Sequence, residues 1–91
     1  MLEVKIQPRK KVTEELVERI CMQQNLTSTM KGSLKSIDAN THWHFKNGKV
    51  KGVLEITLMH NTGEIILAVH ENRNDDWVKT AMQQLERIFN A

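Results

Sequence analysis

The chain has 91 residues, 40% of them apolar and 26% charged, and its formal net charge is +2. This length and composition are typical of one globular domain over residues 1–91 and exclude a disordered chain, while the small net charge gives no support to a polyanionic partner. A single cysteine excludes an internal disulfide, and no run reaches the roughly 20 apolar residues that a membrane-spanning helix needs.

The N-terminal segment alternates apolar and polar residues over 2–7, which predicts a short strand that ends at Pro8. It lacks the apolar stretch of a signal peptide, so we expect a cytoplasmic protein without a membrane partner. Thr13 then offers an N-cap oxygen for a helix that runs to about Asn25. Residues 26–33 show no hydrophobic period and are expected to form a loop.

The dipeptide Asn47-Gly48 predicts a two-residue type I′ hairpin turn, since both central residues of such a turn need positive φ. Strands paired about this turn place one set of side chains on a common face, because side chains alternate with period two. The expected pairs are Phe45 with Val50, Trp43 with Gly52, Thr41 with Leu54, Ala39 with Ile56 and Ile37 with Leu58.

A second hairpin is predicted around Gly63, which suits the left-handed position of a three-residue loop. The result is a three-stranded antiparallel meander from about Ser36 to Glu71. The pairs expected in this hairpin are Leu58 with Ile66, Ile56 with Ala68 and Leu54 with His70.

The last segment is amphipathic and predicts a helix capped by Asn74 or Asp75, with Trp77, Leu85 and Phe89 on its apolar arc. The element order is therefore β-α-β-β-β-α. We predict an α+β fold of two layers, in which both helices pack on one face of the meander. The short N-terminal strand is an optional addition to the edge of the third strand.

This architecture leaves the other sheet face open. In the expected register the open face carries an apolar stripe, which is unusual on a monomer. We therefore expect a non-enzymatic protein-interaction module that self-associates, most simply as a symmetric dimer, or binds a protein partner through this face. The alternative is that part of the loop after the first helix folds under the sheet and buries the stripe. The expected contacts are Val53, Met59, Ile65, Leu67 and Val69.

Nucleic-acid binding, to RNA or DNA, is the alternative function. The expected contacts are a basic run before the first helix and a basic hairpin tip, comprising Arg9, Lys10, Lys11, Lys46, Lys49 and Lys51. The helix-strand-strand-strand-helix order over residues 13–90 is similar to that of double-stranded-RNA-binding domains, although no motif is shared. Such domains place a basic cluster at the start of the last helix. Here Asp75 and Asp76 occupy that position.

A metal site is the third hypothesis. His42 and His44 lie on one strand face, roughly 7 Å apart, and share a metal only if other ligands converge on them. In the expected register a cation, Lys51, lies opposite His44, and an aliphatic residue, Val53, lies opposite His42. The diagonal neighbours with ligand atoms are Asn40 and Glu55. His42 and His44 are thus weak candidates, and no metal or other cofactor is expected.

Catalysis has no pattern to support it. Cys21 lies on the apolar side of the first helix, where we expect a small core residue, and no histidine is paired with it by spacing. Phosphate-binding glycine loops, CxxC pairs and HExxH motifs are absent from the sequence. We therefore expect no catalytic residue and no enzyme activity.

Overall fold

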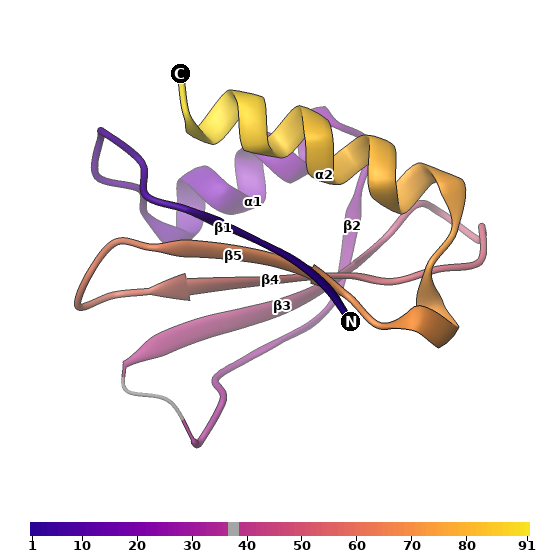
Figure 1. Ribbon diagram of the computed structural model, residues 1–91, viewed down its shortest axis with the longest axis horizontal. Helices are drawn as coiled ribbons and strands as arrows, with labels where there is room; N and C mark the ends of the chain where they lie inside the picture. Colours follow the sequence, from indigo (N-terminus) through magenta and orange to yellow (C-terminus); the bar gives the residue numbers. More distant parts are fainter. Residues whose placement is uncertain (37–38) are drawn as a thin grey trace.

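The computed structural model of the protein describes residues 1–36 and 39–91. It contains a five-stranded antiparallel sheet, in the order β1-β5-β4-β3-β2, with two helices on one face (Figure 1). This confirms the α+β class. The elements are β1 (Leu2–Ile6), α1 (Glu14–Gln23), β2 (Thr27–Gly32), β3 (Asn40–Lys46), β4 (Leu54–Met59), β5 (Ile65–Val69), a 3₁₀ turn η1 (Glu71–Arg73) and α2 (Asp76–Phe89).

Two edge strands extend the predicted meander from three strands to five. β1 pairs with β5, as the sequence allowed. β2 pairs with β3 and occupies the stretch that was expected to be a loop, so that expectation is wrong. All six residues of β2 are exposed, and an edge strand that buries neither face shows no hydrophobic alternation. Its ladder is irregular between Ser28 and Met30, where the register shifts.

The predicted helix caps are present. The Leu16 amide donates to Thr13 Oγ1 over 3.2 Å at the start of α1, and Asp75 caps α2. Asn25 has φ 63°, and the amides of Asn25 and Leu26 donate to Met22 and Cys21 carbonyls. This left-handed residue ends α1 by satisfying its last carbonyl groups.

The hairpin between β3 and β4 has a longer loop than expected. The expected type I′ turn is wrong, because Gly48 has a positive φ but Asn47 does not. A turn closes after the end of β3, where the Val50 amide donates to the Asn47 carbonyl over 3.0 Å, and the chain pairs with β3 again only from Leu54. Gly52, at φ 119°, packs so closely on Trp77 that an added Cβ would lie 2.9 Å from Trp77 Nε1. The Val53 amide donates to the Arg73 carbonyl over 3.0 Å rather than to β3.

The register of β3 and β4 is consequently displaced by four residues from the predicted one. Its inward pairs are Phe45 with Leu54, Trp43 with Ile56 and Thr41 with Leu58. The predicted partner Ile37 lies outside the described residues. Because four is an even number, the displacement leaves every side chain on its predicted face. Trp43 is fully buried, as expected.

The register of β4 and β5 differs by one residue, with Leu58 opposite Ile65 and Ile56 opposite Leu67. A four-residue loop replaces the expected three-residue loop, because Met59 rather than His60 pairs with Glu64. An odd shift exchanges the two faces of a strand. The placement of Ile65, Leu67 and Val69 on the open face is therefore wrong: the three are at most 1% exposed and belong to the core.

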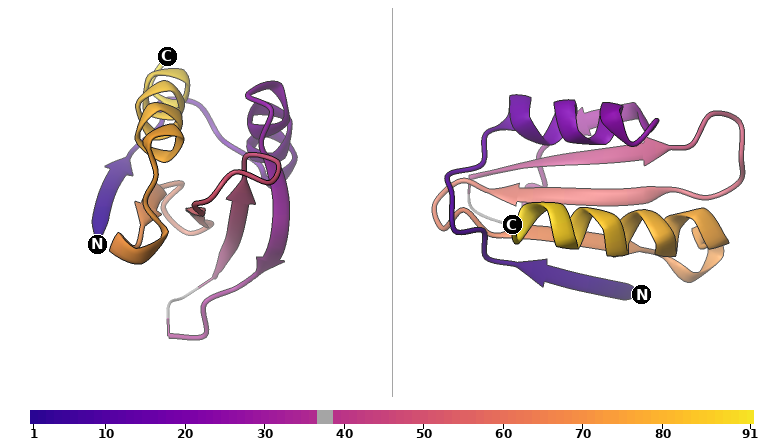
Figure 2. Two further views of the ribbon diagram at one scale, coloured as in Figure 1. Left: turned by 90° about the vertical axis from the view of Figure 1, so that its right-hand side faces the viewer. Right: turned by 90° about the horizontal axis from the view of Figure 1, so that it is seen from above.

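The core lies between the sheet and the helices. α1 lies toward the β2 edge and α2 toward the β1 edge, side by side over one face (Figure 2). Buried side chains from both helices, including Val17, Cys21, Val78 and Leu85, meet those of the sheet. Among the described residues, no helix is long and apolar enough to cross a membrane.

Candidate metal centre

A cluster of ionisable side chains lies on the open face, around Glu55 near the start of β4. The strand alternation that directs Trp43 inward directs its neighbours His42 and His44 outward. Glu55 is directly opposite His44 in the ladder, and Thr57 is directly opposite His42. His70 follows β5, the strand on the other side of β4. The sheet thus brings together residues from three adjacent strands or their ends.

Three imidazoles contact the two oxygens of the Glu55 carboxylate. His42 Nε2 and His44 Nε2 lie 3.1 and 3.7 Å from Oε1, and His70 Nε2 lies 3.0 Å from Oε2. The Glu55 side chain is only 12% exposed and that of His42 7%. A carboxylate so far removed from water needs close partners, and here they are groups that serve either as cations or as metal ligands.

Thr57 fixes the orientation of the more buried imidazole. His42 Nδ1 lies 2.7 Å from Thr57 Oγ1, so one ring nitrogen is held by the hydroxyl while the other faces Glu55. When Nδ1 carries the proton and donates it to Thr57, Nε2 presents a lone pair toward Glu55 Oε1. A partner of this kind on the distal nitrogen is the usual way in which a metal-binding histidine is oriented.

The environment of His44 favours the neutral ring. Burial lowers the pKa of His44 below its ordinary value, and the opposing attraction of the Glu55 carboxylate does not cancel that effect. The positive charge of Arg73 acts in the same direction as burial. A neutral imidazole is the form that coordinates a metal.

The geometry is compatible with coordination of one ion. Ligand atoms of His42, His44 and Glu55 all lie within 4.8 Å of one another. In a tetrahedral site with bonds of about 2.0–2.2 Å, neighbouring ligand atoms are about 3.4 Å apart. The two contacts to Glu55 Oε1 lie on either side of that value.

Sequence reasoning identified the two histidines of β3 and named Glu55 as a diagonal neighbour, but it missed Thr57 and His70. The expected neighbours, Lys51 and Val53, are wrong, because the register places Glu55 and Thr57 there. His70 was expected near the inward face, opposite Leu54, whereas it contacts Glu55. The missed signal was the alternation His42-x-His44 in one strand and Glu55-x-Thr57 in the next, which becomes a cluster once the longer loop is allowed.

A hollow of about 480 Å³ adjoins the cluster. Its remaining walls are the apolar Met30 and Leu34 and the polar Asn72 and Arg73. Two hydrogen bonds hold Leu34 in place: its amide donates to Asn40 Oδ1 over 2.9 Å, and Asn40 Nδ2 donates to its carbonyl over 3.0 Å. The cluster is therefore accessible to a small molecule.

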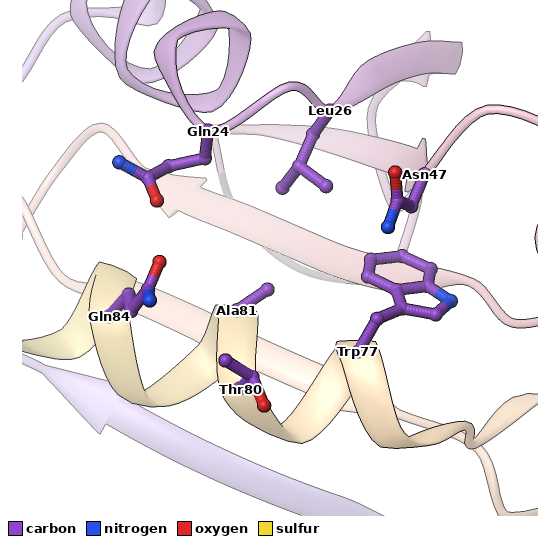
Figure 3. A pocket seen from close by; sticks show the side chains of 7 residues that line it. All are labelled: Gln24, Leu26, Asn47, Trp77, Thr80, Ala81 and Gln84. Carbon is purple, nitrogen blue, oxygen red and sulfur yellow. The ribbon is translucent and has the colours of Figure 1, made fainter.

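A second hollow, of about 230 Å³, lies between α1 and α2 (Figure 3). Trp77 stands at one end, where its Nε1 donates to the Lys51 carbonyl over 2.7 Å. Gln24 and Gln84 face each other across the gap. The described residues that line this hollow are polar or apolar but not titratable. Its lining residues are Gln24, Leu26, Asn47, Trp77, Thr80, Ala81 and Gln84.

Only Val53 and Met59 of the expected interface are left outside the core, and both are half-buried. Self-association and protein binding stay predictions, now without the apolar stripe that suggested them. The basic residues do not form one surface, because the connection between β1 and α1 and the loop between β3 and β4 lie at opposite ends of the molecule (Figures 1 and 2). Nucleic-acid binding also stays a prediction.

Cys21 is fully buried on α1, as expected for a core residue. Burial raises the pKa of its thiol to about 12, so the reactive thiolate does not form at neutral pH.

Neither the protein-family models, the curated proteins nor the solved structures contain a match to this chain.

Proposed function

We propose that this protein binds one divalent transition-metal ion, of which zinc is the best representative, through His42, His44 and Glu55. The observation that supports this proposal is the convergence of two imidazole nitrogens on one oxygen of a buried carboxylate. His70 Nε2 contacts the other oxygen and acts as the partner that orients the carboxylate.

The ligand types select the class of ion. Imidazole nitrogen and carboxylate oxygen suit zinc and its neighbours in the first transition row. Calcium and magnesium prefer sets of oxygen ligands, and soft ions such as copper(I) prefer thiolates or thioethers. A set of two histidines and one glutamate therefore points to zinc or a neighbouring divalent ion such as iron(II).

The competing explanation is a metal-free network in which Glu55 simply balances its histidines. The two explanations differ at His42. Without a metal, Nε2–H donates to Glu55 and the Thr57 hydroxyl donates to Nδ1. With a metal on Nε2, the proton sits on Nδ1 and Thr57 accepts it. Zinc titration followed by calorimetry and by the imidazole nitrogen chemical shifts of His42 separates them.

Chelator-treated protein is expected to bind one equivalent of zinc. Glu55→Gln and His44→Ala each remove a ligand and should weaken binding by more than about 100-fold, because even loss of an orienting partner typically costs about 10–100-fold. Thr57→Val should fall in that smaller range. His60→Ala is the matched control, since His60 contacts Thr41 and Glu14 instead of Glu55. Unchanged zinc affinity in Glu55→Gln would rule out the site.

The prediction that the chain is not an enzyme is untouched by this proposal, because a bound metal serves storage, structure, regulation or catalysis equally well.

A further inference from the structure

The three proposed ligands leave one tetrahedral position open. Structural zinc sites take four protein ligands, whereas sites that exchange ligands take three and leave the fourth position to a small molecule. His42, His44 and Glu55 all border the hollow described above, so an ion held between them faces it. The hollow, at about 480 Å³, has the size of a small-molecule pocket, for which about 300–1,000 Å³ is usual.

An exposed cation, Arg73, borders the same hollow. Arg73 ends η1, where its amide donates to the His70 carbonyl over 2.9 Å and its carbonyl accepts from the Val53 amide over 3.0 Å. Its backbone is thereby held on both sides. Among the described residues, no carboxylate forms an ion pair with its guanidinium.

The charges in the hollow favour an anion. A divalent ion and Arg73 together supply three positive charges against the one negative charge of Glu55. The nearby Glu71 is directed elsewhere, since its carboxylate lies 3.7 Å from the N-terminal amine. A guanidinium presents paired N–H groups that match a carboxylate, and a metal binds one of the carboxylate oxygens directly.

The other walls specify the rest of the ligand. Met30 and Leu34 contribute thioether and aliphatic surface to the hollow, and Met30 is 39% exposed. A purely inorganic anion leaves this surface in contact with water, whereas an apolar group attached to the anion covers it.

Resting on the proposed metal site, we infer that the hollow binds the carboxylate of a small organic acid. One carboxylate oxygen fills the open position on the metal, the other accepts from Arg73, and the apolar part of the acid packs on Met30 and Leu34.

The test uses the full chain loaded with zinc and benzoate as the probe, with acetate and phosphate for comparison. Benzoate is expected to bind only to the zinc-loaded form and more tightly than acetate or phosphate. In protein saturated with zinc, Arg73→Ala should weaken benzoate by about 10–100-fold, as expected for loss of a charge-assisted hydrogen bond. Arg87→Ala, which removes an exposed arginine on α2, is the matched control and should leave benzoate binding unchanged.

Replacing zinc by cobalt(II) gives a second readout, because direct coordination of benzoate changes the visible absorption bands of the ion. If zinc does not bind at all, the proposed metal site fails first. If zinc binds with the expected ligand dependence but benzoate does not, only the present inference is overturned. Tighter binding of phosphate than of benzoate, or benzoate binding without metal, would also overturn it.

Discussion

The carboxylates on the two faces of the sheet differ in their exposure and in their partners. At the rim of the helix-covered face, Glu14 and Glu18 have side chains that are 37% exposed, and Lys31 Nζ lies 3.0 and 2.8 Å from them. On the open face, Glu55 is 12% exposed and its partners are imidazoles. An exposed pair needs only a solvated cation and contributes little to stability. A buried carboxylate needs fixed partners, and histidines add the capacity to ligate a metal. The two clusters therefore differ in the burial of their carboxylates: the Glu55 side chain is 12% exposed, against 37% for Glu14 and Glu18.

The largest expected effect on stability comes from placing a lysine on the buried face of β5 rather than on its open face. Leu67→Lys should abolish folding, because Leu67 is fully buried and an unpaired buried ammonium is too costly for a domain of this size. Ile66→Lys, one residue away on the open face, should leave the chain folded. Circular dichroism and thermal unfolding measure both. A folded, cooperative Leu67→Lys variant would show that the β5 register is wrong.

A smaller effect is expected when each face loses one carboxylate charge. Glu55→Gln should lower the unfolding free energy by about 1–3 kcal/mol in chelator, because the amide that replaces one oxygen is a donor facing imidazole groups. Glu18→Gln should lower it by less than about 1 kcal/mol, as for an exposed ion pair. Urea unfolding of the two variants compares the faces directly, and equal losses would remove the distinction drawn between them.

The smallest effect is the acid response of the helix side. The hydrogen bond from Thr41 and the contacts of Lys31 lower the pKa of Glu14, and Lys31 together with the Trp43 indole lowers that of Glu18. A carboxyl group whose pKa is lowered by folding stabilises the fold above its ordinary pKa, near 4.5. This contribution disappears as the pH falls through the lowered value.

The unfolding free energy should therefore decrease as the pH is lowered from 6 to 3. The decrease should be smaller in Lys31→Ala than in the unmodified chain. Salt at 1 M should flatten it as well, because the pairs are exposed. A Lys31→Ala variant with the same pH dependence as the unmodified chain would show that other groups govern the acid response.

The sequence predicts those parts of the fold that are set locally. Thr13 and Asp75 cap their helices because a side-chain oxygen before an amphipathic run satisfies free amides. Trp43 and Phe45 face inward because they alternate in β3 with the polar residues His42, His44 and Lys46. Where the local pattern is ambiguous, prediction fails. Residues 65–69 are all apolar, so either face of β5 fits the core by composition and the loop length decides the register.

The candidate site depends on pairing between strands, which is why the sequence placed Glu55 only diagonally to the histidines and missed Thr57 and His70. His42 and His44 share a face by alternation alone. Glu55 joins them only because Gly52 and Val53 leave the hairpin to pack against Trp77 and Arg73, contacts that are remote in sequence. The one-residue change in the second loop likewise moved Leu67 from the open face to the core. A turn dipeptide predicts where a loop lies in the sequence but not how many residues the loop contains.

The register shift in β2 has a consequence for growth of the sheet. β2 is the outermost strand beside β3, and an outermost strand offers its unpaired backbone groups to other chains. The irregularity between Ser28 and Met30 breaks its ladder after a short stretch, and Lys31 adds a charge just beyond the break. An incoming strand can pair continuously with only a few residues. This edge is thus poorly suited to seeding aggregation, a protection that the domain obtains without covering the strand.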